Sequence, residues 1–471
     1  MTDVPKITDR ATAEAFLDER IGRGVSPGLE RITGLLDYLA DPHLAYPVVH
    51  IAGTNGKTTA ARIITEILGA HGLRVGTFTS PHLHRIEDRF SIAGSPISGD
   101  RFARAVDEIA WTVTEYERRH EAGPTYFELT AALAFSIFAA EAVDVAVVEV
   151  GLGGRLDATN VVDGAVSVVT GIDIDHTAYL GDTLAAIAAE KVAILGHEGI
   201  LVTGPLPPAA EGPIAARVAE TRSRWVRHPT DFSVVDAAVA VGGWTADLAG
   251  THADYEEVYL ALHGRHQVEH LATSVAAAEA VLGHALDDDA LRAAAAGVTS
   301  PGRLEVVGRA PLTIVDGAHN AQGFAGLADT LETEFPRTRW TLVIGMRGDR
   351  DVARLVAPLE GLVGDVVATA PDDAAAIAAD RVADAVGARL GVPARVVDGV
   401  AAAVADARTS AGADGAVVVA GSLYVAGEAR AALIGERVLP SAVHVRVEPP
   451  PLDLVEGELI DDDGSLDQAY E

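Results

Sequence analysis

Two lysines of this chain occupy positions where arginine could not perform the same chemistry. The sequence contains 36 Lys plus Arg in 471 residues, but its only lysines are Lys6, Lys57 and Lys191. Lys6 belongs to a polar N-terminal segment. A lysine can lose its proton, act as a nucleophile or serve as a compact point charge, whereas an arginine is always charged. This selective usage indicates chemical roles for Lys57 and Lys191.

Lys57 lies in the segment "GTNGKTT", which covers residues 53–59. The apolar stretch "YPVVHIA" precedes the segment, and the helical pattern "AARIITEILGAHG" follows it. A strand, a glycine turn and a helix in this order are typical of a phosphate-binding loop, because the backbone N–H groups can converge on phosphate oxygens. Lys57 would reach the terminal phosphates, and a Thr hydroxyl would contact Mg²⁺ or phosphate. The alternative is a plain glycine turn before a helix.

Acidic side chains and one histidine follow two further apolar runs. The run "VDVAVVE" ends at Glu149, and "AVSVVTGI" is followed by Asp173, Asp175 and His176. Ligands of open α/β sheets gather at the carboxyl ends of the strands. Because Mg²⁺ is usually held by one or two carboxylates plus substrate phosphates, Glu149 is a candidate magnesium ligand. His176 is an unusual Mg²⁺ ligand and could instead be a packing or hydrogen-bonding residue.

Lys191 lies on a predicted helix, "TLAAIAAEKVAIL". Its apolar neighbours indicate partial burial, which would make the amine easier to deprotonate. A neutral amine can take up carbon dioxide to form a carbamate, and this converts a cation into an anion able to help hold Mg²⁺. The alternative is a surface lysine that pairs with Glu190 or another neighbour.

The elements that must position these residues alternate between strands and helices after a helical region at residues 11–40. This alternation predicts an α/β fold with a mostly parallel sheet. A second alternating series starts near residue 310, and the segment "GVTSPGRLE" before it combines Gly, Ser and Pro. We predict an N-terminal phosphate-loop ATPase domain at residues 1–298 and a smaller, Rossmann-like α/β domain at residues 299–437. Residues 438–471 are rich in proline and acid, and we predict a mostly disordered tail there.

The composition narrows the class of protein. A formal net charge of -32 argues against a nucleic-acid partner. The chain has no cysteine, so disulfides and thiol chemistry are excluded. It has no signal-peptide pattern at its N-terminus and no apolar run near the roughly 20 residues of a membrane span. We therefore expect a cytoplasmic protein without a membrane partner.

In order along the chain, these motifs resemble those of the folylpolyglutamate synthase and dihydrofolate synthase family, within the Mur ligase superfamily. The resemblance runs from about residue 27 to residue 435. The matching segments are "LERI", "HIAGTNGKTT", "TSPHL", "TYFELT", "EVGLGGRLDATN", "DHTAYLG", "EK", "GRHQVE", "PGRLE", "DGAHN" and "GSLYVAGE". So many ordered matches are far more specific than any one motif.

The resemblance implies an ATP- and Mg²⁺-dependent ligase that forms an amide bond. ATP would phosphorylate a carboxylate of a pterin substrate, and the amine of L-glutamate would attack the acyl phosphate. The substrates would be dihydropteroate, reduced folates or both, and the segments "GLGGRLDATN" and "LERI" favour a bifunctional enzyme. Related enzymes suggest a monomer.

The resemblance also implies a role for individual residues. The proposed ATP-binding residues are Asn55, Gly56, Lys57, Thr58, Thr59, His270, Arg303 and Asp316. The proposed Mg²⁺ ligands are Ser80, Glu149, His176 and the carbamate of Lys191. The proposed pterin-binding residues are Leu29, Glu30, Arg31, Ile32, Phe127, Leu156, Asp157 and Ala158. His319 and Ser422 would bind glutamate, and the catalytic residues would be Lys191, Asp316 and His319.

The sequence departs from the family pattern at three places. The phosphate loop reads Gly56, Lys57, Thr58 and Thr59, whereas family members often have "GKGS". His270 stands where an Asn usually contacts the nucleotide. The segment "IGMRGDRDV" replaces a lysine-containing "DKD". A histidine can still donate or accept one hydrogen bond, but the second departure puts the contact with adenine in doubt.

Two other functions remain open from the sequence. One is a Mur-type amide ligase for another acidic substrate, although "TSPHL" and "TYFELT" argue against it. The other is a catalytically inactive, nucleotide-binding regulatory protein. That hypothesis predicts the loss of Glu149, His176 or Lys191, and all three are present.

Overall fold

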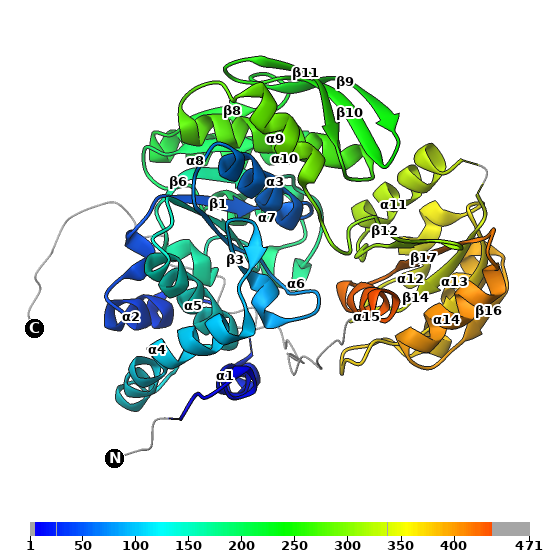
Figure 1. Cartoon of the computed structure of the whole chain (residues 1–471), viewed down its shortest axis with the longest axis horizontal. Coiled ribbons are helices and arrows are strands. Elements are labelled where there is room, and N and C mark those ends of the chain that lie inside the picture. Colours follow the sequence, from blue (N-terminus) through cyan, green and yellow to red (C-terminus); the bar gives the residue numbers. More distant parts are fainter. Residues whose placement is uncertain (1–4, 25, 337, 436–471) are drawn as a thin grey trace, which may run out of the picture.

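The computed structural model describes residues 5–24, 26–336 and 338–435. These residues form two α/β units that lie side by side (Figure 1). The sequence-predicted fold class, a large mostly parallel sheet plus a smaller Rossmann-like unit, is confirmed. Helix α10 (Asp288–Gly297) ends the first unit and strand β12 (Glu305–Arg309) opens the second, and the division between residues 298 and 299 stays a prediction. The predicted tail lies outside the described residues.

The first unit is built on an eight-stranded sheet within the described residues, in the order β4-β3-β2-β5-β1-β6-β7-β8. Strands β2 to β5, β5 to β1, β1 to β6, β6 to β7 and β7 to β8 pair in parallel, whereas β3 and β4 are antiparallel. The strands are β1 (Val48–Ala52), β2 (Val75–Phe78), β3 (Phe90–Ile92), β4 (Ser95–Pro96), β5 (Val145–Glu149), β6 (Gly164–Val169), β7 (Ile200–Thr203) and β8 (Arg224–Arg227).

Helices cover both faces of this sheet. Strands β1 and β5 are buried at every residue, which agrees with their near-continuous apolar sequences. The helices are α1 (Arg10–Asp18), α2 (Glu30–Tyr38), α3 (Lys57–Ala70), α4 (Gly99–Arg119), α5 (Tyr126–Ala140), α6 (Thr177–Leu180), α7 (Leu184–Val192), α8 (Pro208–Thr221), α9 (Arg265–Leu282) and α10. One apolar core lies under α1, α2, α4 and α5, and a second lies under α3, α9 and α10.

A three-stranded antiparallel sheet, which the sequence analysis did not anticipate, packs beside α9. Its strands are β9 (Ser233–Ala240), β10 (Gly243–Ala249) and β11 (Asp254–Leu260). The buried carboxylate of Glu279 on α9 accepts hydrogen bonds from Tyr255 at 2.7 Å and from Thr251 at 2.6 Å. In Figure 1 this small sheet extends the first unit towards the second.

The second unit has a six-stranded sheet within the described residues, in the order β12-β13-β17-β14-β15-β16. All neighbouring strands pair in parallel except β12 with β13. The strands are β12, β13 (Leu312–Val315), β14 (Trp340–Ile344), β15 (Val363–Ala368), β16 (Ala394–Val396) and β17 (Ala416–Ala420). The helices are α11 (Ala321–Glu334), α12 (Val352–Val356), α13 (Ala379–Leu390), α14 (Val400–Ala411) and α15 (Leu423–Ile434).

Helix α11 of the second unit contacts the first unit at both of its ends. Its last residue, Glu334, accepts hydrogen bonds from Trp244 Nε1 at 2.8 Å and from the Gly264 N–H at 2.6 Å. The same carboxylate lies 2.6 Å from His263 Nδ1. At the other end Asn320, the N-cap residue of α11, bonds to Asn55 of the glycine-rich loop at 3.1 Å. Helix α11 is thus fixed across the junction of the two units.

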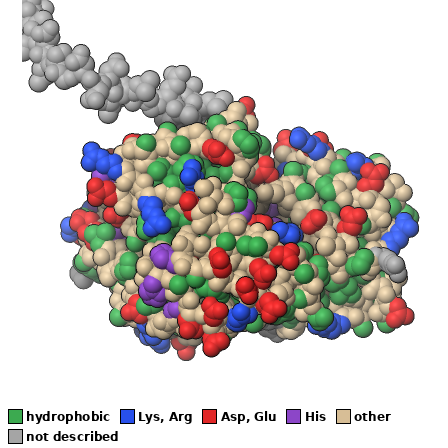
Figure 2. All heavy atoms as spheres, turned by 90° about the horizontal axis from the view of Figure 1, so that it is seen from above, with side chains coloured by type: hydrophobic (Ala, Val, Ile, Leu, Met, Phe, Trp, Pro, Cys, Tyr) green, Lys and Arg blue, Asp and Glu red, His purple; other side chains and the backbone are tan. Residues whose placement is uncertain are grey.

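The surface carries many acidic side chains. Figure 2 shows Asp and Glu distributed over one face of both units, with Lys and Arg between them. This distribution accords with the formal net charge of -32. None of the helices in the described part of the chain has the length and apolar character that a membrane crossing requires.

Candidate active site

The strand order of the first sheet brings the sequence-predicted site residues together. Strand β1 lies between β5 and β6, so the segments that follow these three strands meet at one edge of the sheet. Strand β1 leads into residues 53–57, β5 ends at Glu149, and β6 leads into Asp175 and His176. Ile51 pairs with Glu149 and Ala52 pairs with Val169, which aligns the ends of the three strands.

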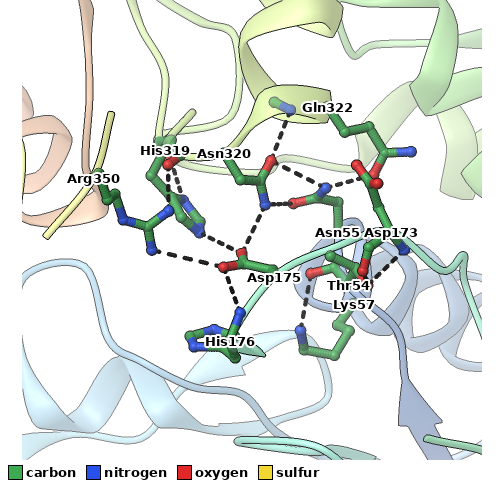
Figure 3. A network of polar contacts seen from close by, with 12 residues as sticks. Thr54, Asn55, Lys57, Asp173, Asp175, His176, His319, Asn320, Gln322 and Arg350 are labelled. Carbon is green, nitrogen blue, oxygen red and sulfur yellow. Dashed lines mark hydrogen bonds and ion pairs between the residues drawn. The ribbon is translucent and has the colours of Figure 1, made fainter. Parts of the chain in front are cut away.

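The glycine-rich loop forms the N-terminus of α3. Gly56 has a φ of 83°, in the left-handed region that favours glycine, and a Cβ there would come within 2.2 Å of the His270 ring. The Thr54 hydroxyl accepts from the Asp173 N–H at 3.0 Å, which connects the loop to the segment after β6 (Figure 3). The backbone of the loop is thereby fixed at a helix N-terminus, where anions bind.

Lys57 and Lys191 share one acceptor. Both ammonium groups donate to the carbonyl of Gly53, from 2.9 Å and 3.0 Å respectively. Burial lowers the pKa of both lysines, and the nearby Lys57 charge contributes to lowering the pKa of Lys191 to about 7. Lys191 is 4% exposed, so it is buried more completely than the partial burial that its apolar neighbours predicted. A substantial fraction of this amine is therefore neutral near pH 7.

Glu149 is a buried carboxylate that faces the loop. Its two oxygens accept from the Thr58 hydroxyl at 2.9 Å, and one of them accepts from the Ser80 N–H at 3.2 Å. Burial raises the pKa of Glu149, and the Lys57 charge and these hydrogen bonds partly offset that effect. The carboxylate would gain from a nearby cation, because the cation favours its ionised form.

His176 adopts a left-handed backbone conformation, with a φ of 52°, immediately before α6. Burial lowers its pKa to about 4, so the imidazole is neutral and can offer a nitrogen lone pair. A small cavity of about 20 Å³ lies between His176, Lys57, Asp175 and Lys191. The Lys191 amine and His176 therefore line the same small cavity.

The side chains at this edge of the first sheet suit Mg²⁺ better than a metal that is held by three or more His, Asp or Glu side chains. In the described part of the chain, no three His, Asp or Glu side chains converge so as to hold a metal ion. The available donors are the Glu149 carboxylate and the Thr58 and Ser80 hydroxyls, all on one cleft. Mg²⁺ typically takes one or two carboxylates and completes its shell with water and phosphate oxygens. The residues present therefore fit this ion.

The second unit contributes its own set of strand ends. Strand β17 lies between β13 and β14, so Asp316 after β13, Ser422 after β17 and Arg347 after β14 line the same edge. The buried Asp316 carboxylate accepts from the Leu304 N–H at 2.9 Å and from the Ala318 N–H at 2.8 Å. Ser422 is the N-cap of α15 and accepts from the Val425 N–H at 3.2 Å.

The two edges face each other across a cleft of about 740 Å³. This volume is within the range of sites that hold a ligand of nucleotide size. Many of the predicted ATP, metal and glutamate residues line the cleft, including Asn55, Gly56, Lys57, Thr58, Thr59, Ser80, Glu149, His176, His270, Arg303, Asp316, His319 and Ser422. Lys191 lies next to it on the small cavity.

The predicted pterin residues are not among those that line the cleft. Ile32 and Ala158 are buried in the apolar core, and Leu29 packs against that core. Arg31 forms an ion pair with Glu128 at 2.9 Å. The exposed residues of this set are Glu30 and Leu156, whereas Asp157 is buried and accepts from the Leu152 N–H at 2.8 Å. Phe127 is half-buried against Gly151, and Gly151 lines the cleft.

Three polar residues at the junction were not singled out from the sequence. Asn320 and Gln322 bond to Asn55, at 3.1 Å and 2.5 Å, and Arg350 donates to the His319 carbonyl at 2.7 Å (Figure 3). A signal for Asn320 exists, because an Asn before a helical pattern is a typical N-cap. Nothing in the sequence reveals which distant residue it meets.

Known proteins resemble both units of this chain. Residues 51–278 match the family of the Mur ligase middle domain, and residues 302–423 match that of the Mur ligase, glutamate ligase domain. The Mycobacterium tuberculosis dihydrofolate synthase/folylpolyglutamate synthase is 38% identical over 458 residues, which cover 90% of this chain and 94% of that protein.

Two solved structures are similar over most of the chain. Mycobacterium tuberculosis folylpolyglutamate synthase, complexed with ADP and AMPPCP, has a TM-score of 0.86 at 37% identity, covering 92% of this chain and all (100%) of that one. Escherichia coli FolC, in complex with DHPP and ADP, has a TM-score of 0.79 at 30% identity, covering 90% of this chain and 97% of that one.

Proposed function

Because the chain belongs to the dihydrofolate synthase/folylpolyglutamate synthase family of Mur ligases, we propose that it adds L-glutamate to dihydropteroate and to reduced folates. The enzyme is an ATP-dependent, amide-forming ligase. The observation that supports this proposal best is the cleft itself. A phosphate-binding loop on one unit faces Asp316, His319 and Ser422 of the glutamate ligase domain across it.

The reaction needs two steps because a carboxylate is a poor electrophile. The pterin carboxylate first attacks the γ-phosphorus of ATP, and the bond to the β-phosphate oxygen breaks to release ADP. The glutamate amine then attacks the acyl carbon, an amide bond forms, and inorganic phosphate leaves with the former carboxylate oxygen as the amine loses a proton. The protein contributes positioning and charge neutralisation in both steps.

We assign the residues as follows. Residues 55–59 bind the ATP phosphates, and Arg303 and Asp316 contact ATP from the second unit. Mg²⁺ would be held by Ser80, Glu149, His176 and the carbamate of Lys191, and when bound it neutralises phosphate charge. His319 and Ser422 bind glutamate. The pterin site would be formed by Leu29, Glu30, Arg31, Ile32, Phe127, Leu156, Asp157 and Ala158, of which Ile32 and Ala158 would shape it from the apolar core. A monomer in the cytoplasm stays a prediction.

The environment of Lys191 supports its carbamylation. The neutral amine attacks carbon dioxide, a C–N bond forms, and one proton is released to the solvent. The lowered pKa supplies the neutral amine, and the shared Gly53 carbonyl holds the two lysine nitrogens close together, so that their like charges repel each other whenever both are protonated. Conversion of one of them to an anion removes this repulsion between like charges.

A paired activity assay tests the proposed function. Purified protein with ATP, Mg²⁺ and glutamate receives either dihydropteroate or tetrahydrofolate, and mass spectrometry identifies the products. We expect one glutamate to be added to each substrate. Addition to one substrate alone would restrict the enzyme to a synthase of that kind.

The same assay separates the other two functions. A folded, ATP-binding protein that glutamylates neither substrate, but releases phosphate with another acidic acceptor, would be a Mur-type ligase of different specificity. A protein that binds ATP and releases no phosphate with any acceptor would be the regulatory protein.

His270 is expected to tune the affinity for ATP without taking part in the chemistry. Its buried ring packs against Gly56, and burial, together with nearby His266, lowers its pKa to about 3, so the imidazole is neutral. His270→Ala should raise the KM for ATP about tenfold, which corresponds to one hydrogen bond of about 1.4 kcal/mol, and should leave kcat within about twofold. Initial rates at varied ATP concentration measure both constants.

A matched control excludes a general effect of replacing a histidine by alanine. His284 is exposed and bonds to the carbonyl next to it, so His284→Ala should leave both constants unchanged. Equal KM values for His270→Ala and the wild type would contradict a nucleotide contact at this residue. His270→Asn should retain most of the affinity, because an amide offers a similar hydrogen bond.

A further inference from the structure

One carboxylate of the first unit meets three residues of the second. The Oδ2 atom of Asp175 accepts from the Asn320 amide at 2.9 Å and lies 3.5 Å from His319 Nε2. Its Oδ1 atom lies 3.7 Å from an Arg350 nitrogen. Figure 3 shows these side chains directed towards Asp175 from the other side of the cleft. None of these contacts is explained by binding of ATP or pterin.

The Asp175 carboxylate is held in place by its own segment. It follows β6, its side chain is 9% exposed, and its Oδ1 atom accepts from the His176 N–H at 2.8 Å. Its position is therefore set by the first sheet, independently of the second unit. A fixed carboxylate can orient the cationic and amide groups that reach it, because hydrogen bonds to an ionised group are roughly twice as strong as neutral ones.

Asn320 connects this carboxylate to the phosphate loop. Its amide nitrogen donates both to Asp175 and to the Asn55 side chain, and its oxygen accepts from the Gly323 N–H at 2.8 Å, at the start of α11. Gln322 bonds to the same Asn55 side chain at 2.5 Å. The start of α11 is therefore oriented by both Asp175 and the loop that would bind the ATP phosphates.

His319 lies between the same carboxylate and its own backbone. Its Nδ1 atom is 2.9 Å from the Gly317 carbonyl, its Nε2 atom faces Asp175, and its carbonyl accepts from Arg350. The two ring contacts, with the Gly317 carbonyl and with Asp175, set the orientation of the imidazole. The orientation of a residue assigned to glutamate is thus set from the opposite unit of the protein.

From this arrangement we propose that Asp175 is a positioning residue for the second step of the reaction. It holds His319 and the start of α11 over the phosphate loop, so that glutamate bound by the second unit meets the acyl phosphate formed on the first. The proposal rests on the proposed function. Without Asp175 the acyl phosphate would still form, but water would compete with the glutamate amine for it.

The test uses Asp175→Asn with Asp173→Asn as the matched control. Asp173 lies two positions away, and its carboxylate accepts from the neighbouring Ile174 N–H at 2.8 Å. For Asp175→Asn we expect a fall of at least tenfold in kcat for glutamylation and a KM for ATP within about twofold of wild type. We also expect more than one phosphate released per glutamate added. Asp173→Asn should keep the ratio at one.

A variant on the other unit excludes a local effect on His176. Asn320→Ala is far from His176 in sequence and should raise the same ratio of phosphate to glutamate. The positioning role is overturned if both variants keep a ratio of one, or if Asp175→Asn alone raises it.

Small-angle scattering tests the contact without any turnover. Ligand-free Asp175→Asn should have a larger radius of gyration than the wild type, because the two units lose a connection. Identical scattering profiles would overturn the inference. If the wild type glutamylates neither pterin, the proposed function fails, and the scattering comparison still decides whether Asp175 holds the two units together.

Discussion

Lys191→Ala is expected to lower kcat for glutamylation about a thousandfold, the typical effect of losing one group that stabilises transition-state charge. Lys191→Arg should be as inactive, because a guanidinium cannot form the carbamate. Lys6→Ala is the matched control, since Lys6 is exposed and the chain has one further lysine, Lys57, in the phosphate loop. Steady-state rates at saturating ATP and glutamate measure the effect.

The carbamate makes a second, independent prediction about Lys191→Ala. A small carboxylate such as acetate or formate can enter the space that the side chain leaves, so it should restore part of the activity of this variant. It should not restore Lys191→Arg, because the longer side chain fills that space. A fully active Lys191→Arg variant would contradict the carbamate.

The dependence on carbon dioxide should follow the pKa of Lys191, which burial lowers from 10.5 to about 7. The neutral amine predominates above that pKa, and carbamate formation releases a proton, so both effects favour the carbamate as the pH rises. At pH 8 about nine-tenths of the unmodified amine is neutral. The gain in activity on adding bicarbonate to depleted buffer should therefore increase from pH 6 to pH 8.

Glu149→Gln is expected to lower kcat by about two orders of magnitude and to raise the Mg²⁺ concentration needed for half-maximal activity. The substitution keeps the volume of the side chain and removes its charge. It also places an amide where the Thr58 hydroxyl and the Ser80 N–H now donate to carboxylate oxygens. Titration of activity with Mg²⁺ at fixed ATP measures both effects.

Two controls separate this effect from loss of folding. Glu190→Gln removes a carboxylate next to Lys191 that forms a partly exposed ion pair with Arg155, and pairs near the surface contribute little to stability. It should leave the Mg²⁺ dependence unchanged. Thermal unfolding of Glu149→Gln should show a single transition near that of the wild type. An unchanged Mg²⁺ requirement in a folded Glu149→Gln variant would remove Glu149 from the ligand set.

The alternation of apolar strands and helical patterns was sufficient to predict which residues follow strand ends. Glu149 ends β5 and Asp175 follows β6, as the apolar runs before them indicated, and Asp316 and Ser422 follow β13 and β17. The burial of Lys191 could also be predicted from the sequence, because its neighbours on the chain are apolar. Both features depend on local sequence, because the spacing of apolar residues along the chain indicates the type of element and which side chains are buried.

Other features depend on contacts between distant segments. The sharing of the Gly53 carbonyl by two lysines joins residues far apart in sequence, and so does the pairing of Asn55 with Asn320. The antiparallel sheet formed by β9, β10 and β11 was missed. Strand β9 is apolar apart from Ser233 and Asp236, yet all of its residues are partly or fully exposed, so its sequence shows no alternation of buried and exposed positions by which a strand could be recognised.

Helix α11 contacts the first unit at both ends, and its Glu334 end can serve as a hinge between the two units. A helix of 14 residues is about 21 Å long and behaves as a stiff rod. If the contacts of Asn320 open while those of Glu334 with Trp244 and Gly264 persist, the helix turns about its far end together with the second unit, because it is packed into the core of that unit. A rotation of roughly 20° would carry its start about 7 Å from the phosphate loop. Such a rotation would open the cleft for substrates and products while the two units stay in contact at Glu334.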